Sequence, residues 1–162
     1  MVRAPRAERP SMPGGYLTAK LLAWPWAEVR LTESRSYWIS TAAKDGAPHA
    51  RPVWGVWLEG LLYFSTGSRI RTHLEREPRI SVNLESGDEC VILEGVAAPL
   101  HDAARTRRVG DLYNAKYHWN LEPKPGEFFE VRPRQVFGWL CDGSGRDAGA
   151  LFSQTATRWR FE

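Results

Sequence analysis

The chain has 162 residues, of which 43% are hydrophobic and 25% charged, and its formal net charge is +3. These values indicate one globular domain with a proper core, and they exclude disordered and collagen-like classes. No apolar run reaches the roughly 18 residues that span a bilayer, and no signal peptide follows the first arginines, so we expect a cytoplasmic protein with no membrane partner. We divide the chain into a flexible or loosely docked N-terminal arm (residues 1–20) and a single domain (residues 21–162).

Charge, cysteine and histidine content indicate few special sites. A net charge of +3 is weak for nucleic-acid binding, so we expect no nucleic-acid partner and keep the arginine-containing arm only as an alternative. Cys90 and Cys141 are far apart in the sequence and are expected to be free thiols. The four histidines show no pairing with one another or with carboxylates at metal-ligand spacing, so we predict neither a metal centre nor a catalytic histidine.

The predicted elements alternate between short strands and three helices. In chain order they are a helix over 25–35, strands over 36–42, 49–58 and 61–64, a helix over 69–77, strands over 80–84 and 90–96, a helix over 102–118, and strands over 127–131, 135–140 and 156–161. Asp45-Gly46 and Glu59-Gly60 predict two-residue turns. Strands joined in this way imply an antiparallel meander that closes into a barrel.

Three local details refine this assignment. The strand over 49–58 is apolar on both faces, as in a covered barrel wall, and Pro52 marks a bulge or an edge within it. Asp102 caps the long helix, whose buried stripe is expected to be Val109, Leu112, Tyr113 and Tyr117. The loop over 142–145 is expected to be flexible.

A polar corner follows the third strand. Ser65, Thr66 and Ser68 supply hydroxyl groups, Arg69 supplies a positive charge, and Arg71 lies two positions along. Hydroxyls, free amides at a helix start and a cation are what a phosphate group requires, so we predict a phosphate site. The alternative is an ordinary capped helix with a solvated arginine.

The strand that contains Arg51, Pro52, Val53 and Trp54 offers a second kind of surface. If Pro52 opens the strand, its backbone groups are free to bind the polar edge of a flat heterocycle, with Val53 or Trp54 on a ring face. The alternative is a plain barrel wall with core tryptophans. The chain has 8 tryptophans, most of which we assign to the core and to a dimer interface.

Together these segments resemble the pyridoxamine 5′-phosphate oxidase-like split β-barrel family of flavin and deazaflavin oxidoreductases. The matching segments are residues 37–41, 45–49, 51–57 and 62–70, Leu74, residues 78–79, 87–89 and 94–95, and for one branch of the family residues 115–117, 131–134 and 156–161. The order and spacing of the segments, more than any single one, carry the resemblance. Many family members have lysine and asparagine where this chain has Ile70 and His73.

The resemblance implies a mainly β fold with flanking helices, an antiparallel split barrel, that forms a homodimer with FMN or coenzyme F420 at the subunit interface. It implies that the strand with Arg51 and Trp54 lines the cofactor ring and that the corner with Ser65 and Arg69 holds the phosphate. Residues from late strands would close the partner's site, and Trp139, Arg158 and Trp159 are the candidates.

The expected function is therefore a hydride exchange between FMN or F420 and a small organic substrate, in which the cofactor carries the chemistry. We expect no true pyridoxamine phosphate oxidation, because no clamp for a substrate phosphate can be assigned. The alternative from another class is a non-catalytic protein that holds flavin, F420 or haem on the same barrel.

Overall fold

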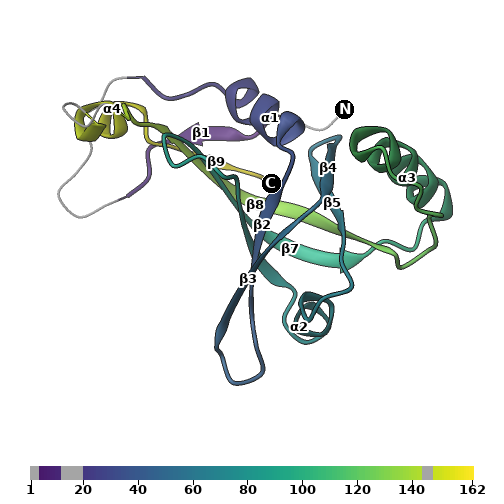
Figure 1. Ribbon diagram of the computed structural model, residues 1–162. Helices are drawn as coiled ribbons and strands as arrows, with labels where there is room; N and C mark the ends of the chain where they lie inside the picture. Colours follow the sequence, from purple (N-terminus) through teal and green to yellow (C-terminus); the bar gives the residue numbers. More distant parts are fainter. Residues whose placement is uncertain (1–3, 12–19, 144–147) are drawn as a thin grey trace.

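The structure is a computed structural model that describes residues 4–11, 20–143 and 148–162. The described residues form nine strands and four helices (Figure 1). In chain order they are β1 (Arg6–Glu8), α1 (Trp24–Glu33), β2 (Tyr37–Ala42), β3 (Pro48–Val53), β4 (Gly55–Leu58), β5 (Leu61–Ser65), α2 (Ile70–Arg76), β6 (Arg79–Asn83), β7 (Glu89–Pro99), α3 (Ala103–Tyr117), β8 (Phe128–Leu140), α4 (Ala148–Thr155) and β9 (Thr157–Arg160).

All strand pairs are antiparallel and belong to one sheet. The main path runs β1-β9-β8-β7-β6-β2-β3, and the β4–β5 hairpin joins it through β8. β8 pairs with β7 along one edge and with two different strands along the other. On that second edge, residues 128–131 pair with β5 and residues 135–138 pair with β9. The sheet therefore splits at β8 and curves around its core, as Figure 1 shows. This confirms the predicted antiparallel barrel architecture.

Two clusters of buried side chains stabilise the fold. The larger one lies inside the sheet and includes Leu31 from α1, Ile70 from α2 and Trp159 from β9. The smaller one joins α3 to β4 and β5 through residues such as Val109 and Tyr113. Apolar side chains at helical spacing thus place each helix on the sheet. Of the stripe predicted for α3, Leu112 is the exception, because 41% of it is exposed.

The predicted strand over 49–58 is in fact two strands with different partners. β3 pairs only with β2 and is largely exposed, whereas β4 pairs with β5 and is buried. The break falls at Trp54 and Gly55, where the Tyr117 hydroxyl oxygen accepts a hydrogen bond from the Gly55 amide at 2.9 Å. A Cβ atom at Gly55 would lie 2.7 Å from the carbonyl oxygen of Tyr63, so only glycine fits there. Pro52 lies on an edge strand, as predicted.

The C-terminal third of the structure differs from the predicted elements in two further ways. Residues 127–131 and 135–140 were expected as two strands but form the single strand β8, which passes Pro133 at a bulge against β7. A proline is tolerated there because the ladder is already interrupted. α4 has no counterpart among the predicted elements. Of the loop predicted over 142–145, residues 144 and 145 lie outside the described residues.

Part of the predicted arm is docked on the sheet. Arg6–Glu8 form β1 beside β9, and the carboxylate of Glu8 pairs with Arg158 and Arg160 at 2.6 and 2.5 Å. Hydrogen bonds from Arg6, Arg160 and Arg158 lower the pKa of Glu8 to about 2. Three residues of the predicted arm thus form a strand beside β9, while residues 1–3 and 12–19 of the arm lie outside the described part.

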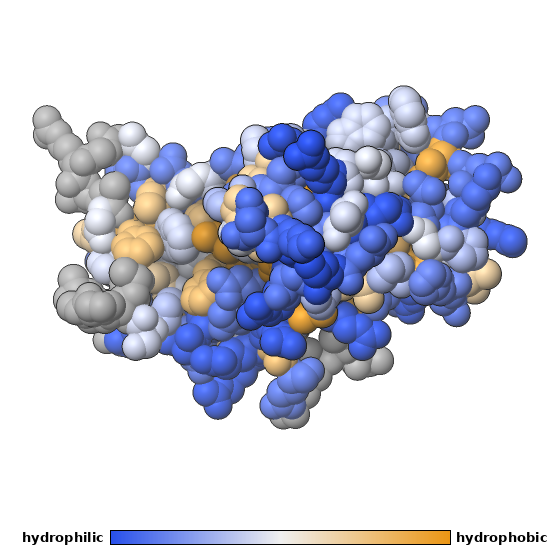
Figure 2. All heavy atoms as spheres, turned by 90° about the horizontal axis from the view of Figure 1, so that it is seen from below, coloured by the Kyte–Doolittle hydropathy of each residue, from blue (hydrophilic) through white to orange (hydrophobic). Residues whose placement is uncertain are grey.

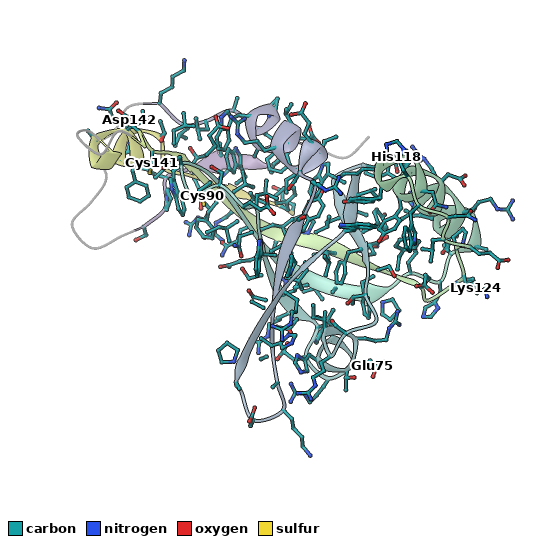
Figure 3. The ribbon with its side chains drawn as sticks, in the orientation of Figure 1. Glu75, Cys90, His118, Lys124, Cys141 and Asp142 are labelled. Carbon is teal, nitrogen blue, oxygen red and sulfur yellow. The ribbon has the colours of Figure 1, made fainter. Side chains whose placement is uncertain are left out.

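Both cysteines are free thiols, as expected, and they lie at the end of the sheet next to α4 (Figure 3). Burial raises the pKa of Cys90 to about 11, so its thiol stays protonated at neutral pH. Among the described residues, no helix has the length and apolar character needed to cross a membrane.

Candidate functional site

Four basic side chains from β3 and the start of α2 gather at one corner of the molecule. We call His49, Arg51, Arg69 and His73 the cationic corner. The β2–β3 register places His49 opposite Thr41, and the Thr41 hydroxyl is 2.9 Å from Nδ1 of His73. The two imidazole rings stand edge to face with their centroids 5.0 Å apart. The hairpin and the helix that follows β5 thus bring together residues that are far apart in the sequence.

The electrostatics of the corner favour an anion. Desolvation, followed by the positive charge of Arg51, the neighbouring His73 and the positive charge of Arg69, lowers the pKa of His49. The guanidinium of Arg69 makes no hydrogen bond or ion pair within the described part of the chain, and Arg51 donates only to the carbonyl of Ala50 at 2.8 Å. Two permanent positive charges are therefore available for a ligand.

The loop between β5 and α2 adds hydroxyl groups to the corner. The Thr66 hydroxyl donates to the Ser68 hydroxyl oxygen at 2.8 Å, and Ser68 in turn accepts from the amide of Ile70 at 3.3 Å. Ser68 thus supports the start of α2 from one position before its N-cap residue, which is Arg69. Since α2 has only seven residues, we attribute the attraction for an anion to the arginines and hydroxyls and not to the helix itself.

Two residues predicted to bind phosphate have structural partners instead. Arg71 donates to the carbonyl oxygens of Gly126 and Glu127 at 3.1 and 3.3 Å and lies over the ring of Phe129. Ser65 donates to the carboxylate of Glu127 at 2.9 Å. Both side chains tie the segment before β8 to the corner. The guanidinium of Arg71, which was predicted to add charge to the phosphate site, therefore already has two acceptors within the chain.

The side chains predicted to lie on a cofactor ring are also engaged within the chain. Val53 is only 8% exposed and belongs to the core. Trp54 points to α3 and stacks on Tyr117, with centroids 4.6 Å apart and an interplanar angle of 2°. A flat ligand at β3 would therefore meet the strand's open edge and the exposed Arg51 and Pro52, not these two side chains.

The three candidates from late strands lie at the far end of the strand order from β3. Trp159 is fully buried in its own subunit, which rules out a contact with a partner's ligand. Arg158 is held by Glu8. Trp139 is half-buried against Phe152, with centroids 5.4 Å apart, and keeps one exposed side. Within one chain, none of the three reaches the cationic corner.

The histidine pair was missed by sequence reasoning, which expected no paired histidines. Nδ1 of His49 is buried and has no hydrogen-bond partner among the described residues. Two signals were present in the sequence. His49 follows the Asp45-Gly46 turn, which sets the register of the hairpin, and His73 stands four residues after Arg69, on the same face of a helix.

A second polar network fixes the chain at the β3–β4 break. The ammonium group of Lys116 donates to the carbonyl of Gly55 at 3.0 Å and to the hydroxyl of Tyr37 at 3.1 Å. Tyr117, the next residue on α3, donates to the same carbonyl at 2.7 Å. Desolvation lowers the pKa of Lys116 to about 8. The open edge of β3 thus ends at a point that α3 holds in place.

Comparisons with known proteins agree with this architecture. The family described as Pyridoxamine 5'-phosphate oxidase matches residues 26–140. No curated protein matches the chain. Three solved structures share the fold. A FAD-binding protein from Mesorhizobium loti has 20% identity and a TM-score of 0.58, with 87% of this chain and 96% of that chain covered.

An F420 reductase has 19% identity and a TM-score of 0.51, with 77% and 98% of the two chains covered. A heme binding protein from Mycobacterium smegmatis has 19% identity and a TM-score of 0.57, with 80% and 61% covered. At these identities the similarity to the solved structures shows the fold alone. Because the family match covers most of the sequence and the sheet has the corresponding split-barrel form, the chain belongs to the pyridoxamine 5′-phosphate oxidase family.

Proposed function

We propose that this protein binds FMN or coenzyme F420 at the cationic corner and exchanges a hydride with a small organic substrate. The observation that carries the proposal is the pair of arginines, Arg51 and Arg69, which lie near His49 and form no ion pair with a carboxylate among the described residues. The fold is shared with an F420 reductase and a FAD-binding protein, and this supports a flavin-like ligand.

The residues present fit a phosphate-bearing cofactor. Arg51, Arg69 and the hydroxyls of Thr66 and Ser68 would hold the phosphate, and the open edge of β3 would bind the polar edge of the ring. Arg69 and Arg51 supply the charge that a lysine would give at the position of Ile70. When bound, such a cofactor supplies the hydride chemistry, while the chain binds it, orients it and excludes water.

Loss of the corner charge tests this proposal. Arg69→Ala is expected to raise the Kd for FMN and F420 about tenfold or more, because a charge-assisted hydrogen bond contributes about 1.5–3 kcal/mol. Titrations monitored by tryptophan fluorescence measure it. Arg107→Ala, an exposed arginine on α3, is the matched control and should change nothing.

Riboflavin makes the test specific for phosphate. The natural protein should prefer FMN to riboflavin, and Arg69→Ala should lose most of that preference. If neither FMN nor F420 binds at about 10–100 μM, a range set by ordinary micromolar affinities, the cofactor proposal fails. Equal losses for FMN and riboflavin would place Arg69 away from the phosphate.

We further propose that the protein is a homodimer. One transverse row of the sheet exposes Trp38, Asn83, Ile92 and Phe137 on the face opposite the core, with Trp139 beside them. Trp38 is 38% exposed, and Figure 2 shows apolar side chains gathered toward the end of the molecule where α4 lies. Half-buried apolar side chains on a sheet face are typical of a surface that a second subunit covers. Light scattering should give a mass near twice 18.4 kDa.

A second candidate function is non-catalytic binding of flavin, F420 or haem on the same barrel. The observation that favours it is the half-buried His49–His73 pair, since a neutral imidazole is a common haem ligand. The fold is also that of a heme binding protein. Haem titration followed by its Soret band, repeated with His49→Ala, separates this candidate from the first. Bound FMN or F420 without turnover by any reductant would support the carrier function.

A further inference from the structure

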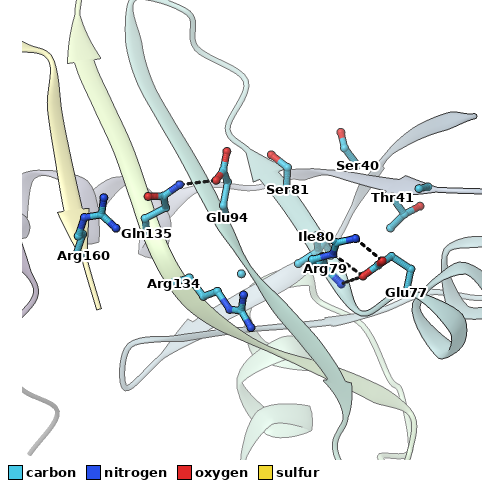
Figure 4. Close-up of a pocket in the computed structure, with 12 residues that line it drawn as sticks. Ser40, Thr41, Glu77, Arg79, Ile80, Ser81, Glu94, Arg134, Gln135 and Arg160 are labelled. Carbon is cyan, nitrogen blue, oxygen red and sulfur yellow. Dashed lines mark hydrogen bonds and ion pairs between the residues drawn. The ribbon is translucent and has the colours of Figure 1, made fainter. Parts of the chain in front are cut away.

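A polar groove of about 600 Å³ lies on the sheet (Figure 4). A register row across five strands runs along it and consists of Ser40, Ser81, Glu94, Gln135 and Arg160. Thr41, whose hydroxyl contacts His73 of the corner, also lines the groove. Its volume suits a small organic ligand.

The bulge in β8 places one further residue at this groove. The β7–β8 register shifts between Glu94 and Gly95, which pair with Gln135 and Pro133, so Arg134 is the extra residue of the bulge. A Cβ atom at Gly95 would lie 2.3 Å from the carbonyl oxygen of Arg132, so the bulge can form only against a glycine. Bulges of this kind commonly redirect a side chain toward a functional site.

Arg134 is the groove cation that no partner neutralises. Arg79 forms a two-point ion pair with Glu77, with contacts of 2.6 and 2.8 Å, and Arg160 pairs with Glu8 at 2.5 Å. The exposed side chain of Arg134 makes no hydrogen bond or ion pair with any described residue. Since Arg79 is paired with Glu77 and Arg160 with Glu8, the charged lining side chains without an ion pair among the described residues are Arg134 and Glu94.

We infer that this groove binds a small organic monocarboxylate, with its carboxylate on Arg134 and its polar substituents on the row from Ser40 to Gln135. A planar guanidinium binds a carboxylate through two parallel hydrogen bonds. The one guanidinium of the groove without an ion pair can hold one carboxylate, and the negative charge of Glu94 would disfavour a dianion. Gln135 already donates to Glu94 at 2.6 Å, which leaves the other oxygen of Glu94 for a ligand hydroxyl or amine. If the proposed function holds, this ligand class is also the substrate class.

Fluorine NMR titration of 4-fluorobenzoate into the full chain, without FMN or F420, tests the inference separately from the cofactor. The neutral 4-fluorobenzamide is the control ligand. We expect the natural protein to bind the acid at least several-fold more tightly than the amide, and Arg134→Gln to remove that difference. Arg132→Gln is the matched control, because Arg132 is exposed on the same strand and pairs only with Glu130.

The inference would be overturned by equal binding of acid and amide to the natural protein, or by equal weakening of acid binding by Arg134→Gln and Arg132→Gln. Failure of 4-fluorobenzoate to bind at millimolar concentrations would also overturn the inference. This holds even if the reason is that a second subunit covers the groove. Circular dichroism and unfolding of each variant show whether a loss comes from the side chain or from misfolding. Loss of FMN binding with retained acid binding would count against the proposed cofactor alone.

Discussion

Replacement of Trp159 by alanine is expected to lower the free energy of unfolding by about 3–5 kcal/mol. Trp159 is fully buried and packs against Trp24 and Trp26, with centroid distances of 5.7 and 6.3 Å. Its six-membered ring lies 2.9–3.0 Å from where a Cβ of Gly138 would stand, and the ring of Trp26 lies 2.9 Å from the same point, so α1, β8 and β9 meet closely there. Removal of the indole leaves a cavity between α1 and the sheet that the neighbouring rings cannot fill.

Trp119→Ala is the matched control for this prediction. Trp119 is 57% exposed and touches Trp54 only edge to face, so its loss should cost about 0.5 kcal/mol or less. Urea unfolding followed by far-UV circular dichroism measures both variants. Trp159→Phe should be tolerated far better than alanine, because the buried indole N–H has no hydrogen-bond partner in the described part of the chain. Similar losses for the two alanine variants would mean that Trp159 does not organise the core.

The sequence predicted the parts of the fold that depend on short-range signals. The Asp45-Gly46 turn forms, with Gly46 at φ 84°, and so does the turn at Glu59 and Gly60. Asp102 caps α3 by accepting a hydrogen bond from the Arg105 amide at 2.7 Å. These features need only neighbouring residues. The β3–β4 break and the course of β8 past Pro133 depend on distant partners, namely Tyr117 and Gly95, so local patterns could not reveal them.

The residues of the candidate site show the same difference between local and long-range signals. Arg69 and Ser68 were recognisable because a turn, a cap and a helix follow one another in the sequence. The use of Arg71 as a brace for Gly126 could not be predicted, since it depends on where the segment before β8 returns. Trp159 and Arg158 were candidates for the partner's site only through the family resemblance, and in the structure the strand alternation buries Trp159 while β1 holds Arg158. A side chain's partner, and not its type, decided each case.

Lys116→Met is expected to make the protein more stable than its natural form at neutral pH, by about 1–2 kcal/mol. Desolvation lowers the pKa of Lys116 from its ordinary 10.5 to about 8, so the folded state holds this proton less strongly than the unfolded state does. The full shift corresponds to about 3 kcal/mol, which partial solvent access reduces. Methionine fills similar space without a charge, while Gly55 keeps its hydrogen bond from Tyr117.

The stability difference between Lys116→Met and the natural protein is expected to depend on pH. Between pH 8 and about 10.5 the unfolded chain binds more protons at Lys116 than the folded chain, so the free energy of unfolding of the natural protein rises with pH in that window. The advantage of Lys116→Met should therefore be complete below pH 8 and disappear above about 10.5. Urea unfolding of both proteins from pH 7 to 10.5 measures it, and other titrating groups cancel in the difference. Lys44→Met, at the exposed hairpin tip, is the control and should show no such trend.

Lower stability of Lys116→Met at pH 7 would contradict this prediction, because the bonds from the ammonium to Gly55 and Tyr37 would then outweigh its burial. The expected result would instead mean that the chain accepts a destabilising charge at the β3–β4 break. That break ends the open edge of β3, where the proposed cofactor ring would bind. A lysine that costs stability and yet fixes this edge fits a site whose geometry matters more than the stability of the fold around it.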